Sequence, residues 1–334
     1  MTLRRMLNLV INETIKILNQ FSTYVMLTLL IGSVIAAGFI FKVNGQMMTY
    51  PNEDWKTQLI QQNKDLEKVL IKQNENDALQ KVLSQTPTGG VQLKDVIEQD
   101  IKTNNYRLVH NLPPTEGRTL WGFVTETSGL ISLVSLLSII ISSGIVAAEF
   151  ITGTIKLLLI RPIKRWKVLL SKYITVLIFA SGGLFILFST SFLVGGLFYG
   201  FSGANQPYLS YIHGNVTEVN MVGHIFATYA YACVSLLMMV TFAFMFSTVF
   251  RNNALAVGTS LFLLFTGDVL ASLLSKYSWV KYVLFANTDL TQYVKGVPLV
   301  AGMTMKFSLI VLTVYFVFFM ATSWIFFSKR DVTE

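Results

Sequence analysis

Long apolar stretches alternate with short polar segments along this chain, and this pattern predicts its architecture. Five stretches contain no charged residue and a sixth contains only Asp268: Phe21–Phe41, Thr127–Ala148, Tyr173–Tyr199, Ile225–Phe250, Phe307–Ser328 and Ala254–Leu274. Each has roughly the 20 residues that a helix needs to cross a bilayer, where backbone polar groups have no water to bond. All prolines lie outside these stretches. The pattern therefore predicts six unbroken transmembrane helices.

Composition supports this interpretation and argues against a soluble protein. Only 13% of the 334 residues are charged and 53% are hydrophobic, whereas globular chains carry roughly 25% charged residues. The first apolar run is too long for the core of a cleaved signal peptide and is followed by no convincing cleavage site. We therefore expect residues 21–42 to remain as the first transmembrane helix.

The net charge of +8 is concentrated in one set of connecting segments. The basic residues of that set are Arg4, Arg5, Lys16, Lys156, Arg161, Lys164, Arg165, Lys167, Lys172, Arg251, Lys329 and Arg330, and its acidic residues are Glu13, Glu149, Asp331 and Glu334. The positive-inside rule makes this side cytoplasmic, with both termini inside, although four lysines in the last outer loop oppose the bias. This topology explains the basic charge without nucleic acid as a partner.

Two polar regions are predicted to add helices outside the spans. Residues 1–20 place Leu3, Leu7 and Ile11 among charged residues at helical spacing, as in an amphipathic helix at the cytoplasmic interface or a cytoplasmic extension of the first span. Residues 43–120 form an extracytoplasmic insert whose charges nearly balance. Within it we expect helices over 52–85 and 91–103, which either bind a substrate or partner or pack on the outer mouth.

The remaining outer connections differ in character. Phe201–Gly223 is expected to be a short loop without basic residues. Residues 276–306 contain Trp279, Tyr282, Phe285 and Tyr293. This semi-apolar composition predicts interfacial or re-entrant helices before the last span. We expect residues 121–334 to hold the second to sixth transmembrane helices, so that the fold class is an all-α polytopic membrane protein.

The connection after the second span has the most informative sequence. Glu149-Phe150 ends that span, Gly153-Thr154 permits a turn, and a short apolar run containing Lys156 leads to Arg161-Pro162 and then Arg165. A basic amphipathic elbow of this kind suits docking on a cytoplasmic partner. An ordinary charged loop that fixes topology is the alternative.

This segment, residues 149–165, resembles the coupling-helix region of ABC-2 type transporter permeases. In that family an acidic-aromatic pair precedes Gly-Thr, an apolar run and an Arg/Ser-Pro-x-x-Arg element, as here. The resemblance extends to the predicted topology and to Phe285–Leu290, which is similar to the family's sequence before the last span. The long 43–120 insert departs from the compact exporters. It is more similar to Gram-positive members involved in export of, or immunity to, antimicrobial peptides.

The resemblance implies a transport subunit of a bacterial plasma-membrane exporter, not an enzyme. Two permease copies, or two related permeases, would form the pathway above a cytoplasmic ABC ATPase dimer. Glu149, Phe150, Gly153, Thr154, Lys156, Arg161, Pro162 and Arg165 would then couple the chain to that ATPase. The chain has no G-x-x-x-x-G-K-[ST] motif, so ATP and Mg²⁺ are expected in the partner, with no cofactor here. The cargo would be an antimicrobial peptide, an antibiotic or another amphipathic molecule.

Other candidate residues are few. Asp268 lies well inside the fifth span and Glu126 at the outer end of the second; both are candidates for the translocation pathway, although Asp268 could instead meet water at a bend near Gly267. No spacing indicates a metal or catalytic site. The alternatives to a permease are a peptide-capturing immunity or receptor protein without transport and an intramembrane enzyme, for which no paired acids or histidines occur within a span.

Overall fold

The computed structural model describes residues 3–47, 55–75, 93–114, 119–151, 164–201, 207–212, 214–250, 252–294, 298–300 and 302–329. These residues are mostly helical. Six helical segments are long and apolar enough to cross a membrane: Phe21–Val43, Leu120–Glu149, Arg165–Tyr199, Met221–Val249, Asn253–Leu273 and Met305–Lys329. The predicted spans are therefore helical, as expected of a multi-pass membrane protein.

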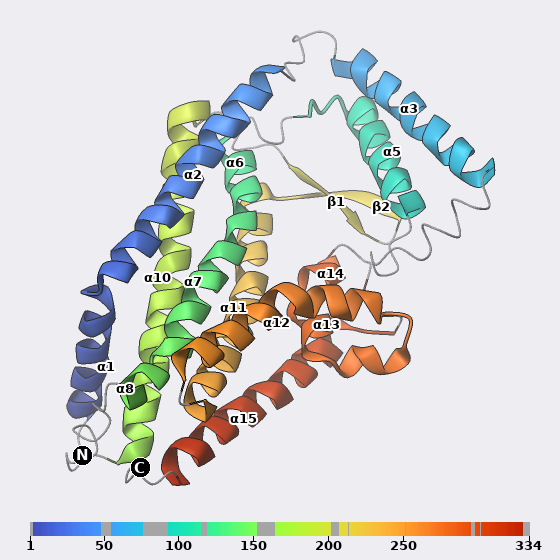
Figure 1. The fold of residues 1–334 in the computed structure, drawn as a ribbon. Coiled ribbons are helices and arrows are strands. Elements are labelled where there is room, and N and C mark those ends of the chain that lie inside the picture. Colours follow the sequence, from blue (N-terminus) through green and yellow to red (C-terminus); the bar gives the residue numbers. More distant parts are fainter. Residues whose placement is uncertain are drawn as a thin grey trace.

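Three helices form the centre of the bundle (Figure 1). They are α7 (Ile131–Gly144), α10 (Arg165–Tyr199) and α11 (Met221–Val249). Around them pack α1 (Leu3–Leu18), α2 (Phe21–Met47), α6 (Leu120–Thr127), η1 (Ser128–Leu130), α8 (Ala147–Ile151), α12 (Asn253–Leu273) and α15 (Met305–Lys329). The start of α1 and the end of α15 lie at one end of the bundle, which we call the terminal end; the opposite end is the distal end.

Buried apolar side chains hold the central helices together. Val34, Phe123, Val176, Leu187 and Val240 come from four different helices and are fully buried in one cluster. Inside the bilayer the surroundings of a helix are as apolar as its side chains, so the hydrophobic effect contributes little to helix association there. Close packing of the side chains is then the larger contribution to stability. Small and hydroxyl side chains add to it: Ser142 Oγ on α7 donates to the Val240 carbonyl on α11 at 2.8 Å.

The second span contains a break that its neighbour satisfies. Between α7 and α8 the helix turns at Ile145 and Val146. The freed N–H groups of Val146 and Ala147 both donate to Ser247 Oγ of α11 at 3.1 Å. A break in an apolar helix persists when a neighbouring hydroxyl pairs the exposed backbone. This break points α8, and with it Glu149, toward α1 and α10.

Several helix ends differ from the expected bounds. α10 begins at Arg165, eight residues before the apolar run that starts at Tyr173, because a helix can continue beyond the hydrocarbon core with polar residues on its exposed face. In the 43–120 insert, α3 is Trp55–Glu75 and α5 is Leu93–His110, so α5 continues past Thr103. The remainder of the helix expected over 52–85 lies outside the described residues.

The distal end contains a β-hairpin where the sequence predicts a loop, and this corrects the expectation of an all-α chain. β1 (Tyr208–Ile212) pairs antiparallel with β2 (Asn215–Val219), and Tyr208 faces Val219. Gly214 in the turn has a φ of 87°, a left-handed conformation that glycine adopts without strain.

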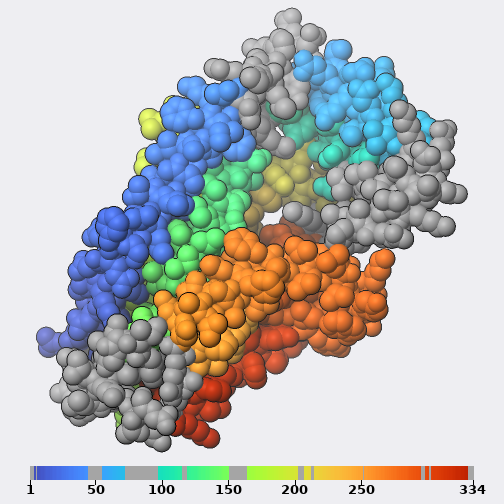
Figure 2. Space-filling model, in the orientation of Figure 1, coloured from blue at the N-terminus to red at the C-terminus, as the bar shows by residue number. Residues whose placement is uncertain are grey.

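The hairpin joins the insert to the bundle. Lys102 Nζ of α5 donates to Tyr211 Oη at 3.3 Å and to the Gly214 carbonyl at 3.2 Å. Asn63 of α3 pairs with Asn104 and Asn105 of α5, each at 2.9 Å. Figure 2 shows the light-blue α3 as a projection at the distal end. Beneath the hairpin lies a cavity of about 380 Å³ whose lining includes Ser128 and Tyr231.

The segment before the last span is helical and returns to the bundle. It contains η2 (Ser278–Tyr282), α13 (Leu284–Thr288) and α14 (Thr291–Val294). Asn287, which is completely buried, donates through Nδ2 to the carbonyls of Lys281 and Val283 at 2.8 Å and accepts from Ser308 of α15 at 2.6 Å. One amide therefore anchors these short helices to the sixth span.

Candidate functional site

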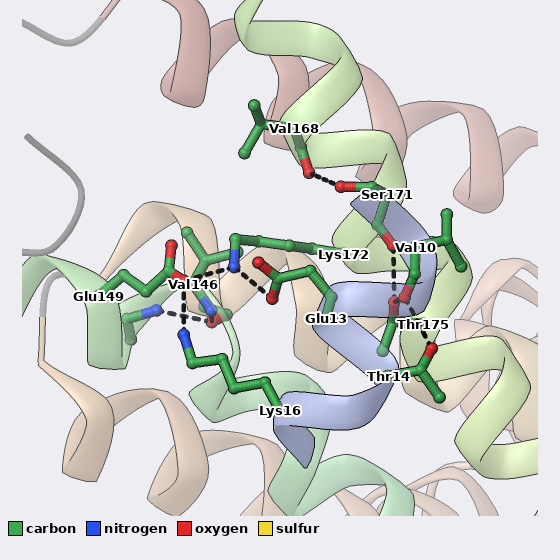
Figure 3. Close-up of polar contacts among 12 residues, drawn as sticks. Val10, Glu13, Thr14, Lys16, Val146, Glu149, Val168, Ser171, Lys172 and Thr175 are labelled. Carbon is green, nitrogen blue, oxygen red and sulfur yellow. Dashed lines mark hydrogen bonds and ion pairs between the residues drawn. The ribbon is translucent and has the colours of Figure 1, made fainter. Parts of the chain in front are cut away.

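Four charged side chains from three segments meet at the terminal end of the bundle (Figure 3). They are Glu13 and Lys16 of α1, Glu149 of α8 and Lys172 of α10, and we call them the charge cluster. Lys172 Nζ lies 2.7 Å from Glu149 Oε1 and 2.8 Å from Glu13 Oε2, and Lys16 Nζ lies 2.8 Å from Glu149 Oε1. The two cations and two carboxylates balance, so the cluster is neutral.

Lys172 is the centre of the cluster and has no exposed side-chain surface. Its neighbours along α10 include Val168, Leu169, Tyr173 and Val176, all buried. An unpaired ammonium in such surroundings is strongly disfavoured, whereas an ammonium held by two carboxylates is tolerated. Lys172 therefore requires both α1 and α8 to be in place, and the cluster ties these two elements to α10.

The spacing of Glu13 and Lys16 explains how α1 contributes two charges. Residues three apart lie on the same face of a helix, and this face of α1 also carries Ile17, which is buried in the main core. Lys16 is half exposed, and burial opposes its charge. The hydrogen bond and charge of Glu149, followed by the charge of Glu13, outweigh that effect and raise the pKa of the Lys16 ammonium.

The sequence predicts a different role for Glu149. The sequence placed it at the end of the second span as the first residue of the coupling segment, and the structure places it in α8 with only 3% of its surface exposed. Its Oε1 atom accepts from both lysines. The first residue of the segment 149–165 thus joins α8 to α1 and α10.

Arg165 lies at the other end of the same segment. It is the first residue of α10, and its guanidinium donates to the Ser328 carbonyl near the end of α15 at 3.1 Å. The backbone of Phe150 belongs to α8. Gly153, Thr154, Lys156, Arg161 and Pro162 lie outside the described residues. Both flanks of the segment are therefore anchored in the bundle.

The two candidate pathway residues lie elsewhere. Glu126 is exposed on α6, at the distal end, and Asp268 is exposed on α12. Asp268 shares its helix with Phe262, Phe265 and Val269, whose side chains are exposed by at least half. The structure brings neither residue into the charge cluster. Among the residues that it describes, no group of three or more His, Cys, Asp and Glu side chains could hold a metal ion.

Sequence reasoning treated three members of the cluster only as markers of sidedness. Lys172 lies one residue before the uncharged run 173–199, and Glu13 and Lys16 lie on one helical face. A basic residue so close to an apolar span and an acid-base pair at helical spacing are weak signals for pairing. Nothing in the order of residues indicates that α1 returns to pack on α10, and that contact creates the cluster.

Comparison with known proteins shows the family to which this chain belongs. Residues 94–333 match the family model described as "Protein of unknown function (DUF2705)". The chain is 44% identical over 332 residues to "Uncharacterized protein YhcI" of Bacillus subtilis (strain 168), covering 98% of this chain and 100% of that protein. It is 36% identical over 214 residues to "Uncharacterized membrane protein YdbK" of the same organism, covering 63% of this chain and 82% of that protein.

Proposed function

We propose that this multi-pass membrane protein of the DUF2705 family is the permease subunit of an ABC-2 type exporter. In this role the six spans form half of a translocation pathway, and a separate cytoplasmic ABC ATPase dimer supplies the energy. The terminal end of the bundle is then cytoplasmic, and the membrane is the bacterial plasma membrane. ATP and Mg²⁺ bind to the partner, and this chain performs no covalent chemistry.

The observation that carries the proposal is the position of Glu149. It begins the segment that resembles a coupling helix, and it is tied by short ion pairs to Lys16 and Lys172. A displacement of that segment by an ATPase would reach α8, α1 and α10 together, since breaking the pairs would leave charge buried. Arg165 would transmit the same displacement to α15 through Ser328.

The exposed face of α12 supports a second permease in the assembly. Phe262 and Phe265 are each 63% exposed there, and Asp268 is exposed beside them. A carboxylate facing lipid costs about 2.5–3.5 kcal/mol on insertion scales. Covering this face with a second permease, so that Asp268 borders a water-containing pathway between the two, removes that cost. Glu126 at the distal end of α6 would border the exit.

A peptide-capturing immunity protein is the second candidate function. The cavity of about 380 Å³ beneath the β-hairpin favours it, because this volume falls within the range of small-molecule sites and its lining includes Tyr208, Tyr211 and His224. In that role the distal end binds an antimicrobial peptide and no ATPase is needed. An exporter of the same peptide, an antibiotic or another amphipathic molecule could use the cavity as its release site.

A mild-detergent pulldown of the tagged chain from native membranes, followed by the mass of the intact complex, tests the permease proposal. We expect a near-stoichiometric ATPase and two permease chains. Scrambling residues 153–163, which leaves Glu149 and Arg165 in place, should release the ATPase from a chain that still inserts. Scrambling residues 202–206 in the distal connection is the matched control and should retain it.

Two outcomes would reject the permease role. A chain that purifies without an ATPase under several gentle conditions is a stand-alone protein. Peptide resistance that persists after deletion of every co-purifying ATPase supports capture without transport.

A further inference from the structure

A cavity of about 240 Å³ adjoins the charge cluster on the side away from α10. It lies between α1, the start of α2, the end of α7, α8 and the first residue of α12. Its apolar part is formed by Met26, Ile140, Ile141 and Ile145, and its polar part by Glu149 and Asn253 together with Lys16. The cavity is therefore amphipathic, and it lies where the first span leaves the terminal-end interface.

Two of the residues that line this cavity each have a buried oxygen atom without a hydrogen-bond partner. These atoms are Glu149 Oε2 and Asn253 Oδ1, and no group in the part of the chain that the structure describes donates to either. The Glu149 side chain is 96% buried, and its other oxygen accepts from both lysines. A buried acceptor left unpaired costs about 1–3 kcal/mol. Two such acceptors on residues that line one cavity would be satisfied by a ligand that donates hydrogen bonds.

The mouth of the cavity indicates where that donor comes from. Lys16 is 52% exposed, Gln20 and Ser22 are exposed, and the adjoining α2 presents exposed Phe21 and Val25. An apolar helix surface of this kind faces lipid acyl chains in a membrane. A donor attached to a lipid can enter from this side and leave its acyl chains against α2.

We propose that this cavity binds the headgroup of an aminophospholipid, of which phosphatidylethanolamine is the simplest example. Its primary ammonium donates to Glu149 Oε2 and Asn253 Oδ1, and its phosphate accepts from Lys16 at the mouth. The charge cluster is neutral, so a headgroup with one positive and one negative charge leaves the local balance unchanged. A purely anionic headgroup brings a net negative charge beside Glu149 and has no ammonium to donate to the two oxygens.

The proposal does not depend on a transport function. Bound there, the headgroup contacts α1, α8 and α12 at once, and it stabilises the arrangement in which α1 closes over the charge cluster. The lipid would therefore stabilise the position of α8, the helix that precedes residues 152–163. If the chain is a permease, the bound lipid would influence how easily α8 moves when the ATPase acts on it.

A graded headgroup series tests the site in the wild-type protein. Phospholipids with ethanolamine, monomethyl-ethanolamine, dimethyl-ethanolamine and choline headgroups keep the same charge, while N–H donors fall from three to none. The purified full-length chain is titrated with each lipid in detergent, and bound lipid is counted by native mass spectrometry. We expect affinity to fall along the series, by at least about tenfold from ethanolamine to choline. Soluble phosphoethanolamine should bind far more weakly than the lipid because it lacks acyl chains.

Variants locate the site. Asn253→Ala removes one acceptor, and Gly144→Ala crowds it, because an added Cβ would lie 3.2 Å from Asn253 Oδ1. Each should reduce the preference for ethanolamine over choline, whereas Asn12→Ala, on the exposed surface of α1 outside the cavity, should not change it.

Three results would overturn the proposal. Equal binding of the ethanolamine and choline lipids would show that the oxygens bind water only. Tighter binding of phosphatidylglycerol than of either would show an anion site on Lys16. A preference that is unaffected by both Asn253→Ala and Gly144→Ala would place the lipid elsewhere on the protein.

Discussion

Lys172 Nζ lies 2.7 Å from Glu149 Oε1 at a position where the lysine side chain has no exposed surface. The two residues belong to α8 and α10, the helices on either side of the segment 152–163, so the ion pair links the two helices that flank this segment. Removing either partner of a buried ion pair leaves the other charge unpaired away from water, which strongly destabilises the folded state. This dependence makes the pair a structural connection between the second and third spans.

Replacing Lys172 with methionine should destabilise the protein by about 3–5 kcal/mol, because two buried carboxylates lose their shared cation. The loss is measured by thermal unfolding of the purified chain in detergent. Lys164→Met, at an exposed position just before α10, is the matched control and should change stability little. The double variant Lys172→Met with Glu149→Gln should lose less than the sum of its single variants; additive losses would contradict a direct pair.

Gly267→Ala should destabilise the protein by about 1–3 kcal/mol through overpacking. An added Cβ would lie 2.3 Å from the Phe285 ring of α13, so the ring and its short helix must move. Gly258→Ala on the same helix is the control, since nothing lies within 4 Å of its added Cβ. Alanine favours the helix by about 1 kcal/mol there. Equal melting temperatures for the two variants would exclude the close approach of α13.

Asn287→Ala should weaken the attachment of the segment 278–294 to α15 by about 1–3 kcal/mol, because the carbonyls of Lys281 and Val283 lose their donor. Asn287→Asp should be worse than alanine at neutral pH, since a carboxylate would face those carbonyls and cannot donate to them. Limited proteolysis within the segment 278–294 measures the effect. Greater protease sensitivity of the alanine variant than of the aspartate variant would contradict this geometry.

Asp268→Asn should impair export while leaving the permease pair and its ATPase assembled. The side chain is exposed on α12, where a pathway between two copies would place it against water or cargo. Resistance to the exported compound, compared with the mass of the intact complex, separates these effects. The Thr259→Ser variant on an exposed turn of the same helix is the control. Unchanged transport by Asp268→Asn would remove the residue from the pathway.

The sequence predicts that α1 is an amphipathic helix, but it does not predict what this helix packs against. The spacing of Leu7, Ile11 and Ile15 predicts an amphipathic helix, and a helix is present with these side chains exposed. Whether it lies in the interface or extends the first span depends on what its other face contacts. That face packs on α10 and carries Glu13 and Lys16 into the charge cluster.

The β-hairpin was missed for a related reason. Residues 208–219 are too short and too polar to stand out beside six apolar spans, and an isolated hairpin is marginal without support. Its support comes from α5, through Lys102 and through Tyr106, whose hydroxyl donates to Glu218 at 3.2 Å. These contacts join residues more than a hundred positions apart, so the local sequence of the hairpin does not predict them.

The sequence by itself determined the spans, because lipid allows an uncharged stretch of about 20 residues no other ordered conformation than a helix. It also determined where charge collects, because a charged residue is disfavoured inside a span. Only the tertiary structure decided which charges meet. Lys172, Glu149 and Glu13 are isolated along the chain, and their pairing follows from the packing of α1 on α10 and from the break that Ser247 stabilises between α7 and α8. Membrane insertion is a property of each segment alone, whereas a buried ion pair exists only once the helices are assembled.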